Sequence, residues 1–266
     1  MSLNYILERV AETASTNDDL LARWRSNTLI DPVARITQKQ TAGKGRAGRA
    51  WRSHPGDTLC FSVAYPFQRR PIELSGLSLC IGLAVIAGIA SAFKLSEADL
   101  YKLGLRLKWP NDLLLNGAKL GGILIEGGQA HPQALTWMII GIGINLQNAS
   151  GMETALGGQP HLKVGALDQL ISASQALPDT EYIWLKILDS CAHYLAEFER
   201  SGFSCFQADW NNWDAYQGQS VCISGAGQAP IFGDAAGIDQ DGALILQQSD
   251  KNTLVHAGDL SLRVQT

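Results

Sequence analysis

The sequence predicts an α+β protein in which a mixed, largely antiparallel sheet is backed by helices and followed by a small β-domain. Between residues 105 and 144 apolar strand segments follow one another closely, and an Asn-Gly turn joins two of them. Two long segments, at residues 74–93 and 181–199, predict helices that cover this sheet. After residue 216 short strands alternate with Gly and Asp turns, so we expect two domains, residues 1–216 and 217–266.

The first helix is predicted to begin at the polar triplet Ser15-Thr16-Asn17, which precedes two aspartates and an apolar pair. A polar cap followed by acids in the first turn is the usual start of a helix. Residues 33–37 then predict a short strand and residues 58–65 a second one, with a glycine-rich loop between them.

Residues 74–93 carry no charge and are long enough to cross a bilayer. The segment is rich in Gly, Ser and Ala and stands alone in the chain, so we interpret it as a buried core helix. A strand is expected at residues 105–108. The Asn116-Gly117 turn should then join strands at 112–115 and 119–126, and another apolar strand is expected at 136–144.

Residues 181–199 have the helical period, because apolar residues recur along one stripe and Gly202 lies just past the end. A second helix is expected around residues 206–216. Short strands are then expected at 221–224, 230–232, 243–247 and 253–256, which indicate an SH3-like or similar barrel. Such a small domain buries little core of its own and is expected to lean on the larger one.

The composition is typical of a globular protein. The 266 residues are 46% hydrophobic and 17% charged, which excludes a disordered chain, and a formal net charge of −4 makes nucleic acid an unexpected partner. Five cysteines without Cys-x-x-Cys spacing and five scattered histidines argue against disulfides or a protein-built metal site, and for a reducing cytosol. The first residues lack a basic and apolar leader, so we expect no signal peptide and a cytoplasmic protein.

One loop is unusually dense in glycine and positive charge. Residues 43–49 read Gly-Lys-Gly-Arg-Ala-Gly-Arg. Glycine gives backbone freedom and arginine grips phosphate oxygens through two nitrogens, so the loop is suited to closing over an anionic ligand such as a phosphate. A flexible surface loop with solvated charges is the alternative, but three interleaved cations favour a function.

The same loop matches the Gly-x-Gly-x-x-Gly pattern of dinucleotide-binding proteins, but its context contradicts that interpretation. A dinucleotide loop opens a helix whose N-terminus holds the pyrophosphate, whereas this loop leads into Trp51, a turn and a strand. The acidic ribose partner expected about twenty residues further on is also missing. Neither the catalytic set of a kinase nor a Walker A sequence occurs.

Three further segments carry residues suited to chemistry. Residues 108–112, Lys-Trp-Pro-Asn-Asp, place a cation, an aromatic ring and an amide–carboxylate pair at a strand end, where Pro110 should hold the chain extended; an ordinary turn is the alternative. Lys119 follows the hairpin turn with Gly-Gly at 121–122, which lets a ligand approach the backbone; an exposed turn lysine is the alternative. Residues 141–145, Gly-Ile-Gly-Ile-Asn, form a strand ending in an amide, with a β-bulge and a turn Asn as the alternative.

Together, and in this order, these segments resemble those of the biotin protein ligases, which attach biotin to the carrier domains of carboxylases. The resemblance covers nearly the whole chain, from residues 15–17 to residues 232–242 of the small domain, which include Gly-Ile-Asp at 237–239. It implies a class II synthetase-like catalytic domain followed by the small barrel. Lys44 departs from the arginine usual in the family, and Ala236 from the basic residue of some members. We expect the monofunctional type, without the N-terminal DNA-binding domain of repressor members.

The resemblance implies an ATP-dependent reaction in two steps. Biotin becomes biotinyl-5′-AMP, and biotin is then transferred to a lysine of the biotin carboxyl carrier domain of a carboxylase such as acetyl-CoA carboxylase. Mg²⁺ is expected to arrive with the nucleotide. No DNA or membrane partner is expected, and edge strands of the sheet could pair two copies as a homodimer.

The resemblance also implies a role for each site residue. Catalysis is assigned to Lys119, Arg46, Arg49 and Asp112, with Lys119 bridging the biotin carboxylate and the α-phosphate. Biotin is expected to contact Ser15, Thr16, Asn17, Gln40, Gly43, Lys44, Gly45, Arg46, Lys119 and Gly122. ATP and the adenylate are expected to contact Trp51, Lys108, Asn111, Asp112 and Asn145, and no protein-built metal site is assigned.

Two other functions stay open at this point. A lipoate or octanoate protein ligase or transferase has a similar fold and logic, but centres on a different glycine-rich segment and lacks Lys-Trp-Pro-Asn-Asp. A non-catalytic binder of a small ligand or nucleic acid could use the basic loop, although the acidic net charge weighs against nucleic acid.

Overall fold

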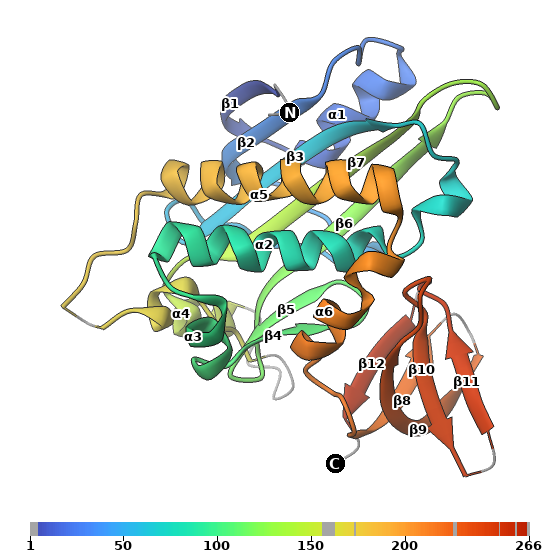
Figure 1. Cartoon of the computed structure of the whole chain (residues 1–266). Coiled ribbons are helices and arrows are strands. Elements are labelled where there is room, and N and C mark those ends of the chain that lie inside the picture. The colour runs from blue at the N-terminus through green and yellow to red at the C-terminus, as the bar shows by residue number, and fades with distance from the viewer. Residues whose placement is uncertain are drawn as a thin grey trace.

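The computed structural model describes residues 5–155, 163–172, 174–225, 228–249, 251–258 and 260–264. Figure 1 shows a large sheet crossed by two long helices, with a second, smaller sheet at the C-terminal end. The expected α+β architecture, a mixed sheet backed by helices and a small antiparallel β-unit, is confirmed.

The large sheet has seven strands in the order β1-β2-β3-β7-β6-β5-β4. Only the pair β1–β2 is parallel among the described strands. The strand at Ile6–Thr13 was not predicted, because it has no regular apolar–polar alternation and neither of its faces is buried. The bounds are β1 Ile6–Thr13, β2 Val33–Gln40, β3 Thr58–Phe67, β4 Leu105–Lys108, β5 Asp112–Leu115, β6 Ala118–Gln129 and β7 Thr136–Asn145.

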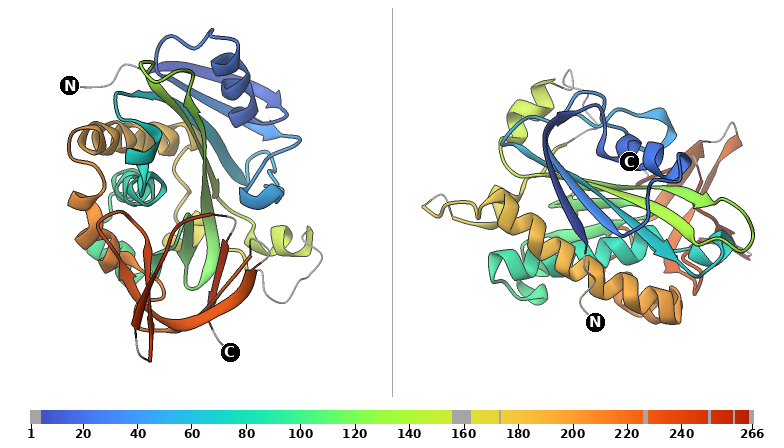
Figure 2. Two further views of the ribbon diagram at one scale, coloured as in Figure 1. Left: turned by 90° about the vertical axis from the view of Figure 1, so that its right-hand side faces the viewer. Right: turned by 90° about the horizontal axis from the view of Figure 1, so that it is seen from above.

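Helices cover the two faces of this sheet unequally. α1 (Thr16–Arg25) packs on the face that carries Ala64 and Ile139, and α2 (Leu77–Phe93) and α5 (Thr180–Ser201) cover the opposite face (Figure 2). Successive residues of a strand point to opposite faces, so the neighbouring pair Val63 and Ile140 belongs to the α2–α5 core.

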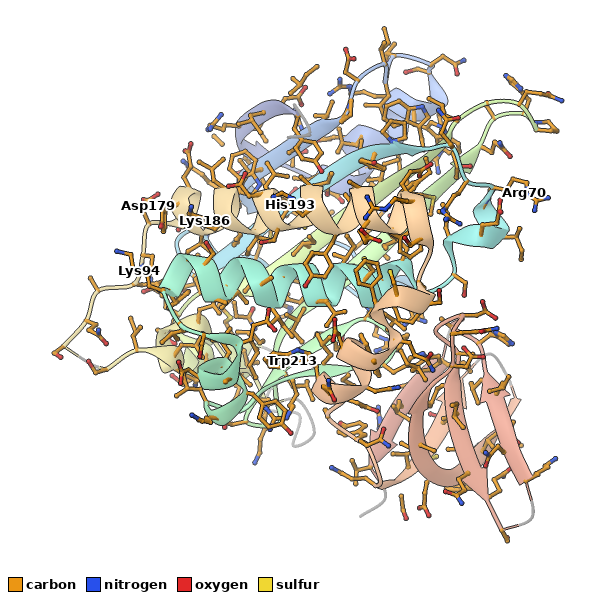
Figure 3. The ribbon with its side chains drawn as sticks, in the orientation of Figure 1. Arg70, Lys94, Asp179, Lys186, His193 and Trp213 are labelled. Atoms are coloured by element: carbon orange, nitrogen blue, oxygen red, sulfur yellow. The ribbon has the colours of Figure 1, made fainter. Side chains whose placement is uncertain are left out.

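α2 is the buried core helix expected from its composition, although it begins three residues later than predicted because Pro71–Leu74 form a separate 3₁₀ turn. A side-chain carbon at Gly88 would lie 2.5 Å from the Cα of Ile187, so this glycine lets α2 and α5 pack closely. Lys186 and His193 lie on the outward side of α5 (Figure 3). Within the described residues, no helix is both long and apolar enough to cross a membrane.

Three shorter helices complete the large unit: α3 (Glu97–Lys102), α4 (Ala149–Ala155) and α6 (Gln207–Trp213). Short 3₁₀ turns also occur at Arg46–Gly48, Leu167–Leu170 and Ser204–Phe206. The helix expected at 206–216 ends earlier, because Asp214 forms a β-bridge to Leu107 and the next residue donates its N–H to the Leu107 carbonyl at 2.7 Å.

The two turns that flank β5 differ from each other. Asn116 and Gly117 both have positive φ, 50° and 76°, which confirms the predicted hairpin turn. The expectation that Pro110 holds its segment extended was wrong. The Trp109–Pro110 peptide is cis, and the N–H of Asn111 donates to the carbonyl of Lys108 at 3.1 Å, so the segment is a tight turn between β4 and β5.

The small sheet is antiparallel, in the order β11-β10-β9-β8-β12. As expected, it leans on the larger unit: the indole N–H of Trp109 donates to the carbonyl of Gly242 at 3.1 Å, and Val221 and Leu244 belong to the main hydrophobic cluster. Its last strand was not predicted. The bounds are β8 Ser220–Gly225, β9 Gln228–Ile238, β10 Leu244–Gln248, β11 Lys251–Val255 and β12 Leu260–Val264.

Candidate active site

A cavity of about 260 Å³ lies on the α1 face of the large sheet. Small side chains of the central strands form its floor, because Cys60 and Ser62 of β3 lie beside Gly143 and Gly141 of β7. The glycine loop, the β4–β5 turn and β12 of the small sheet form its walls. All the predicted site residues line this cavity except Gly43, which packs against the backbone of Trp51.

One end of the cavity is polar but uncharged. Ser15 caps α1, and the next residue, Thr16, donates its backbone N–H to the side-chain carbonyl of Gln40 at 2.9 Å. The hydroxyls of Thr16 and Ser62 are 2.7 Å apart, and Ser62 donates to Oδ1 of Asn17 at 2.6 Å. All of these side chains are buried except Gln40, which is half-buried, and they fix one another in place as a rigid set of hydrogen-bonding atoms.

The glycines of β7 leave room for two of the side chains in the cavity. A Cβ at Gly141 would lie 2.4 Å from Oδ1 of Asn17, and one at Gly143 would lie 2.5 Å from the indole of Trp51. The indole N–H of Trp51 points to the sulfur of Cys60 at 3.3 Å. Burial raises the pKa of Cys60 to about 11, so it presents a neutral thiol to the ring.

The glycine loop is closed by its own backbone hydrogen bonds. The N–H of Trp51 donates to the carbonyl of Gly43 at 2.8 Å, and the N–H of Gly45 donates to that of Arg49 at 2.6 Å. Of the three loop glycines only Gly48 has positive φ, at 69°. Gly43 is needed for a different reason, since a Cβ there would lie 2.5 Å from the Trp51 carbonyl oxygen.

A β-bulge turns Lys119 into the cavity. Between β5 and β6 the register passes from Leu113–Gly121 to Leu114–Lys119, which leaves Leu120 as the extra residue. Lys119 and Gly122 are three positions apart, so in a regular strand their side chains would point to opposite faces; the bulge places both on the cavity side. No local pattern in residues 118–122 predicts this bulge, whose position depends on the pairing of β5 with β6.

Lysines surround a single carboxylate at the charged end. The amine of Lys119 lies 2.6 Å from Oδ1 of Asp112, and the amine of Lys108 lies 3.9 Å from Oδ2. Burial lowers the pKa of Lys108, and the attraction of Asp112 opposes that effect, while nearby cations such as Lys119 and Arg49 lower the pKa further. The cluster therefore carries more positive charge than Asp112 can balance.

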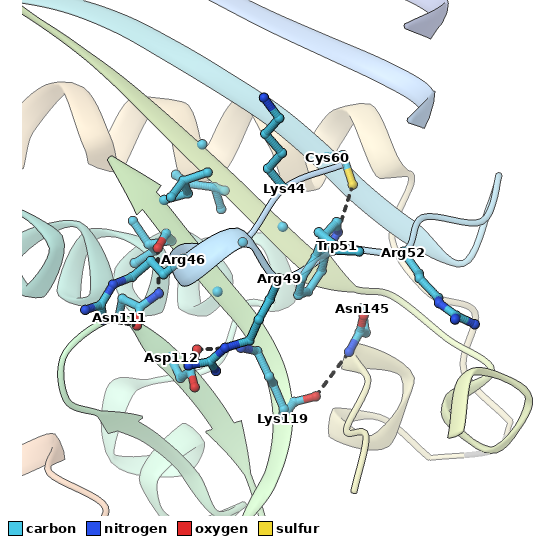
Figure 4. Close-up of a pocket in the computed structure, with 18 of the residues that line it drawn as sticks. Lys44, Arg46, Arg49, Trp51, Arg52, Cys60, Asn111, Asp112, Lys119 and Asn145 are labelled. Atoms are coloured by element: carbon cyan, nitrogen blue, oxygen red, sulfur yellow. Dashed lines mark hydrogen bonds and ion pairs between the residues drawn. The ribbon is translucent and has the colours of Figure 1, made fainter. Parts of the chain in front are cut away.

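Two of the loop cations reach this end, and the third does not. Arg46 donates to Oδ1 of Asn111 at 2.9 Å and also to the carbonyl of Gly258, which lies between β11 and β12. Figure 4 shows Arg49 extending toward the Asp112 and Lys119 pair, whereas Lys44 points away from it. The amine of Lys44 is 2.8 Å from a carboxylate oxygen of Asp18 on α1.

Asn145 was expected to contact the nucleotide, and the structure shows in addition that its side chain bonds to the protein backbone. Its amide nitrogen donates to the carbonyls of Lys119 and Gly165, both at 3.1 Å, and the residue is only 6% exposed.

Several other residues that line the cavity belong to no motif recognised in the sequence. Among them, Ser62 could have been noticed only as a polar residue in an apolar strand. These residues are Cys60, Ser62, Met152, Lys163, Val164, Leu260, Ser261 and Leu262.

The charge of the cavity is opposite to that of the chain. Among the described residues that line it, the only carboxylate is Asp112, against seven cationic side chains, whereas the whole chain carries a formal charge of −4. No cluster of three metal-ligating side chains occurs among the described residues. The arrangement suits a ligand with a neutral polar head, an apolar body and an anionic centre. The cations are Lys44, Arg46, Arg49, Arg52, Lys108, Lys119 and Lys163.

Comparisons with known proteins agree with this arrangement. The family profile described as Biotin/lipoate A/B protein ligase family matches residues 10–145, and the Biotin protein ligase C terminal domain matches residues 217–263. The chain is 32% identical to a Mycobacterium tuberculosis biotin–[acetyl-CoA-carboxylase] ligase, over 96% of this chain and 88% of that protein. It is also 32% identical to the Escherichia coli bifunctional ligase/repressor BirA, over 94% of this chain and 71% of that protein.

Solved structures give the same fold. A biotin protein ligase from Aquifex aeolicus, in complex with biotin and ATP, matches with a TM-score of 0.76 over 98% of this chain and 99% of that one, at 24% identity. This likeness concerns the fold. Since one family profile covers half of the chain, and relatives at 32% identity cover nearly all of it, the chain belongs to the biotin/lipoate A/B protein ligase family.

Proposed function

We propose that this chain is an ATP-dependent biotin protein ligase that activates biotin as biotinyl-5′-AMP and transfers it to a lysine of a biotin carboxyl carrier domain. The observation that carries the proposal is the cavity itself. A neutral, rigid polar end and a strongly cationic end meet over a glycine floor in a protein of negative net charge. Two relatives, from Mycobacterium tuberculosis and Paracoccus denitrificans, are named biotin–[acetyl-CoA-carboxylase] ligases.

In the first step a carboxylate oxygen of biotin attacks the α-phosphorus of ATP, and the bond to pyrophosphate breaks. Two anions must approach each other, so cations have to offset their repulsion and the charge that grows in the transition state. Lys119 serves both groups after exchanging its partner Asp112 for oxygens of the substrates. Arg46 and Arg49 grip phosphate from the loop, which also excludes water.

Biotin enters with its ureido ring toward the neutral end. Thr16, Asn17 and Gln40 supply donors and acceptors for that ring, with the capping residue Ser15 and the backbone around Gly45 closing the pocket. Lys44 contributes through its backbone, because its amine is paired with Asp18 on α1. A dithiolane ring such as that of lipoate would leave these buried polar groups without partners, which disfavours a lipoate ligase.

In the second step the amine of the acceptor lysine attacks the carbonyl carbon of the adenylate, and AMP leaves. The amine must lose a proton, and its usual pKa is about 10.4. Asp112 accepts that proton or orients the amine once Lys119 has moved to the phosphate. Trp51 and Asn111 hold the nucleotide part, and Asn145 borders that part of the cavity while its amide nitrogen bonds to the backbone.

The proposal also includes the metal cofactor, the division into domains, the cellular location and the protein partners. Mg²⁺ enters with the phosphates, which agrees with a lining whose described residues offer one carboxylate, since nucleotide-bound Mg²⁺ needs few protein ligands. The catalytic unit is residues 1–216, and residues 217–266 form the small domain. The protein works in the cytoplasm on the carrier domain of acetyl-CoA carboxylase, and two copies can pair through sheet edges.

The test is a transfer assay with purified protein, ATP, Mg²⁺, biotin and a biotin carboxyl carrier domain, read with labelled streptavidin. ATP-dependent labelling of the acceptor lysine is expected, and a carrier in which that lysine is replaced by arginine is the matched control. Absence of labelling with a folded protein and a competent carrier would overturn the proposal. Lipoate in place of biotin tests the alternative directly, with carrier lipoylation as its readout.

A further inference from the structure

Lys119 lies beyond the end of the pairing between β6 and β7. That pairing begins at Gly121 and Ile144, so β7 leaves the peptide of Lys119 without a partner on that side. Residues 163–165, here called the strap, take the place of the missing strand. The N–H of Lys119 donates to the carbonyl of Lys163 at 2.8 Å, and the N–H of Gly165 donates to the carbonyl of Lys119 at 2.9 Å.

Asn145, the last residue of β7, joins the strap to Lys119. Its amide nitrogen has two hydrogens, and the carbonyls of Lys119 and Gly165 accept one each. The side chain is buried, so replacing it would leave these carbonyls with one donor fewer and no water to compensate. Both hydrogens of the amide nitrogen are therefore used within the protein.

The strap is fixed in turn to α4. The backbone N–H of Val164 donates to a carboxylate oxygen of Glu153 at 2.7 Å. Met152 of α4 and Val164 both line the cavity, whereas Glu153 does not. Helix α4, which forms part of the cavity wall, is therefore connected through the strap to the backbone of Lys119.

We propose that Asn145 and Glu153 are positioning residues that act through Lys119, by holding the strap against its peptide. The inference rests on the proposed ligase function and deepens it. The backbone of Lys119 adjoins a β-bulge and has to be held in place if its amine is to reach a phosphate oxygen. A small displacement of a catalytic group lowers the rate of reaction more than it lowers the binding of substrate. Loss of either residue should therefore lower kcat for adenylate formation and leave KM for ATP nearly unchanged.

A double-mutant cycle tests the route through Lys119. Single-turnover formation of biotinyl-AMP is measured for wild type, Asn145→Ala, Lys119→Gln and the double variant, with Gln147→Ala as the matched control, since that exposed amide donates to a carbonyl outside the cavity. Asn145→Ala should lose about tenfold or more in kcat in the wild-type background, and less than about twofold in the Lys119→Gln background. Equal losses in both backgrounds, or a raised KM at constant kcat, would overturn the inference.

A second pair of variants keeps the inference testable if Asn145→Ala does not fold. Glu153→Gln retains an oxygen that accepts from Val164, whereas Glu153→Ala does not. We expect Glu153→Ala to lower kcat about threefold or more at constant KM, and Glu153→Gln to restore it. Equal rates for the two variants would refute a role through the strap. An inactive wild type would instead refute the proposed function.

Discussion

Two glycines on one strand should respond very differently to the same substitution. Gly141 and Gly143 lie two residues apart on β7, face the same cavity, and in each case an added Cβ would come within about 2.5 Å of a side chain. At Gly141 that side chain is Asn17, which is buried and lies in the first turn of α1. At Gly143 it is Trp51, which is half-buried on the glycine loop.

The magnitude follows from what each neighbour can do. Asn17 has no room to retreat, so Gly141→Ala combines overpacking, about 1–3 kcal/mol, with the loss of hydrogen bonds to Ser62 and Glu126, about 1 kcal/mol each. The substitution also restricts the unfolded chain, which returns about 0.4–1 kcal/mol. The net loss is about 2–5 kcal/mol, or about 5–20 °C in Tm for a chain of this size.

Gly143→Ala should instead displace Trp51 and with it the loop. The indole can swing toward solvent, so the free energy of unfolding should change by less than about 1 kcal/mol. The stabilisation of the protein by ATP should fall, because Trp51 no longer sits in its place beside Cys60.

Thermal unfolding of both variants, alone and with biotin or ATP, measures these effects. We expect a low Tm and a weak biotin shift for Gly141→Ala, and a normal Tm with a weak ATP shift for Gly143→Ala. Equal Tm values for the two variants, or an undiminished ATP shift in Gly143→Ala, would refute the reasoning.

Four further outcomes are expected. Lys119→Ala should lower biotinyl-AMP formation by about a hundredfold or more with little change in Tm, and full activity in a pyrophosphate-release assay would remove its assigned role. Arg46→Gly should form the adenylate but release it, so that streptavidin blots show more labelled bystander lysines; constant labelling would show that the loop does not retain it. Asp112→Asn should slow transfer from preformed adenylate more than about tenfold, and an unchanged rate would leave only an orienting role. Burial raises the pKa of Asp214 to about 6, so the folded state binds the extra proton and stability falls as pH rises through 6. Asp214→Asn should therefore raise stability at pH 7–8 by up to about 3 kcal/mol and have no effect below about pH 4, as thermal unfolding across pH will show.

Much of the fold could be predicted, because local patterns determine it. The period of α5, the uncharged run of α2 and the Asn116-Gly117 turn each depend on neighbouring residues. β1 and β12 were missed, since β1 has no buried face and β12 is a short strand defined mainly by its partner β8. At Pro110 an extended segment was expected and a turn was only the alternative, because the sequence does not distinguish a cis from a trans peptide.

The sequence predicted which residues lie around the site, but not the hydrogen bonds and ion pairs that they make there. The motifs named residues that lie around one cavity, and their roles in binding and catalysis stay predictions. The pairing of Lys44 with Asp18, the bulge that turns Lys119 inward and the bonds of Asn145 to the strap all depend on register between distant segments. Such register is decided by the packing of the whole sheet, and no local pattern carries it.

The hydrogen bonds that close the glycine loop on itself affect how it can move. Because Gly43 is bonded to Trp51, and Gly45 to Arg49, the segment between them has already given up most of its freedom as a chain. It can therefore swing as one stiff flap about its two ends. A flap of this kind adds little entropic penalty when it shuts on a bound molecule, so most of the attraction between its arginines and a phosphate remains available as affinity.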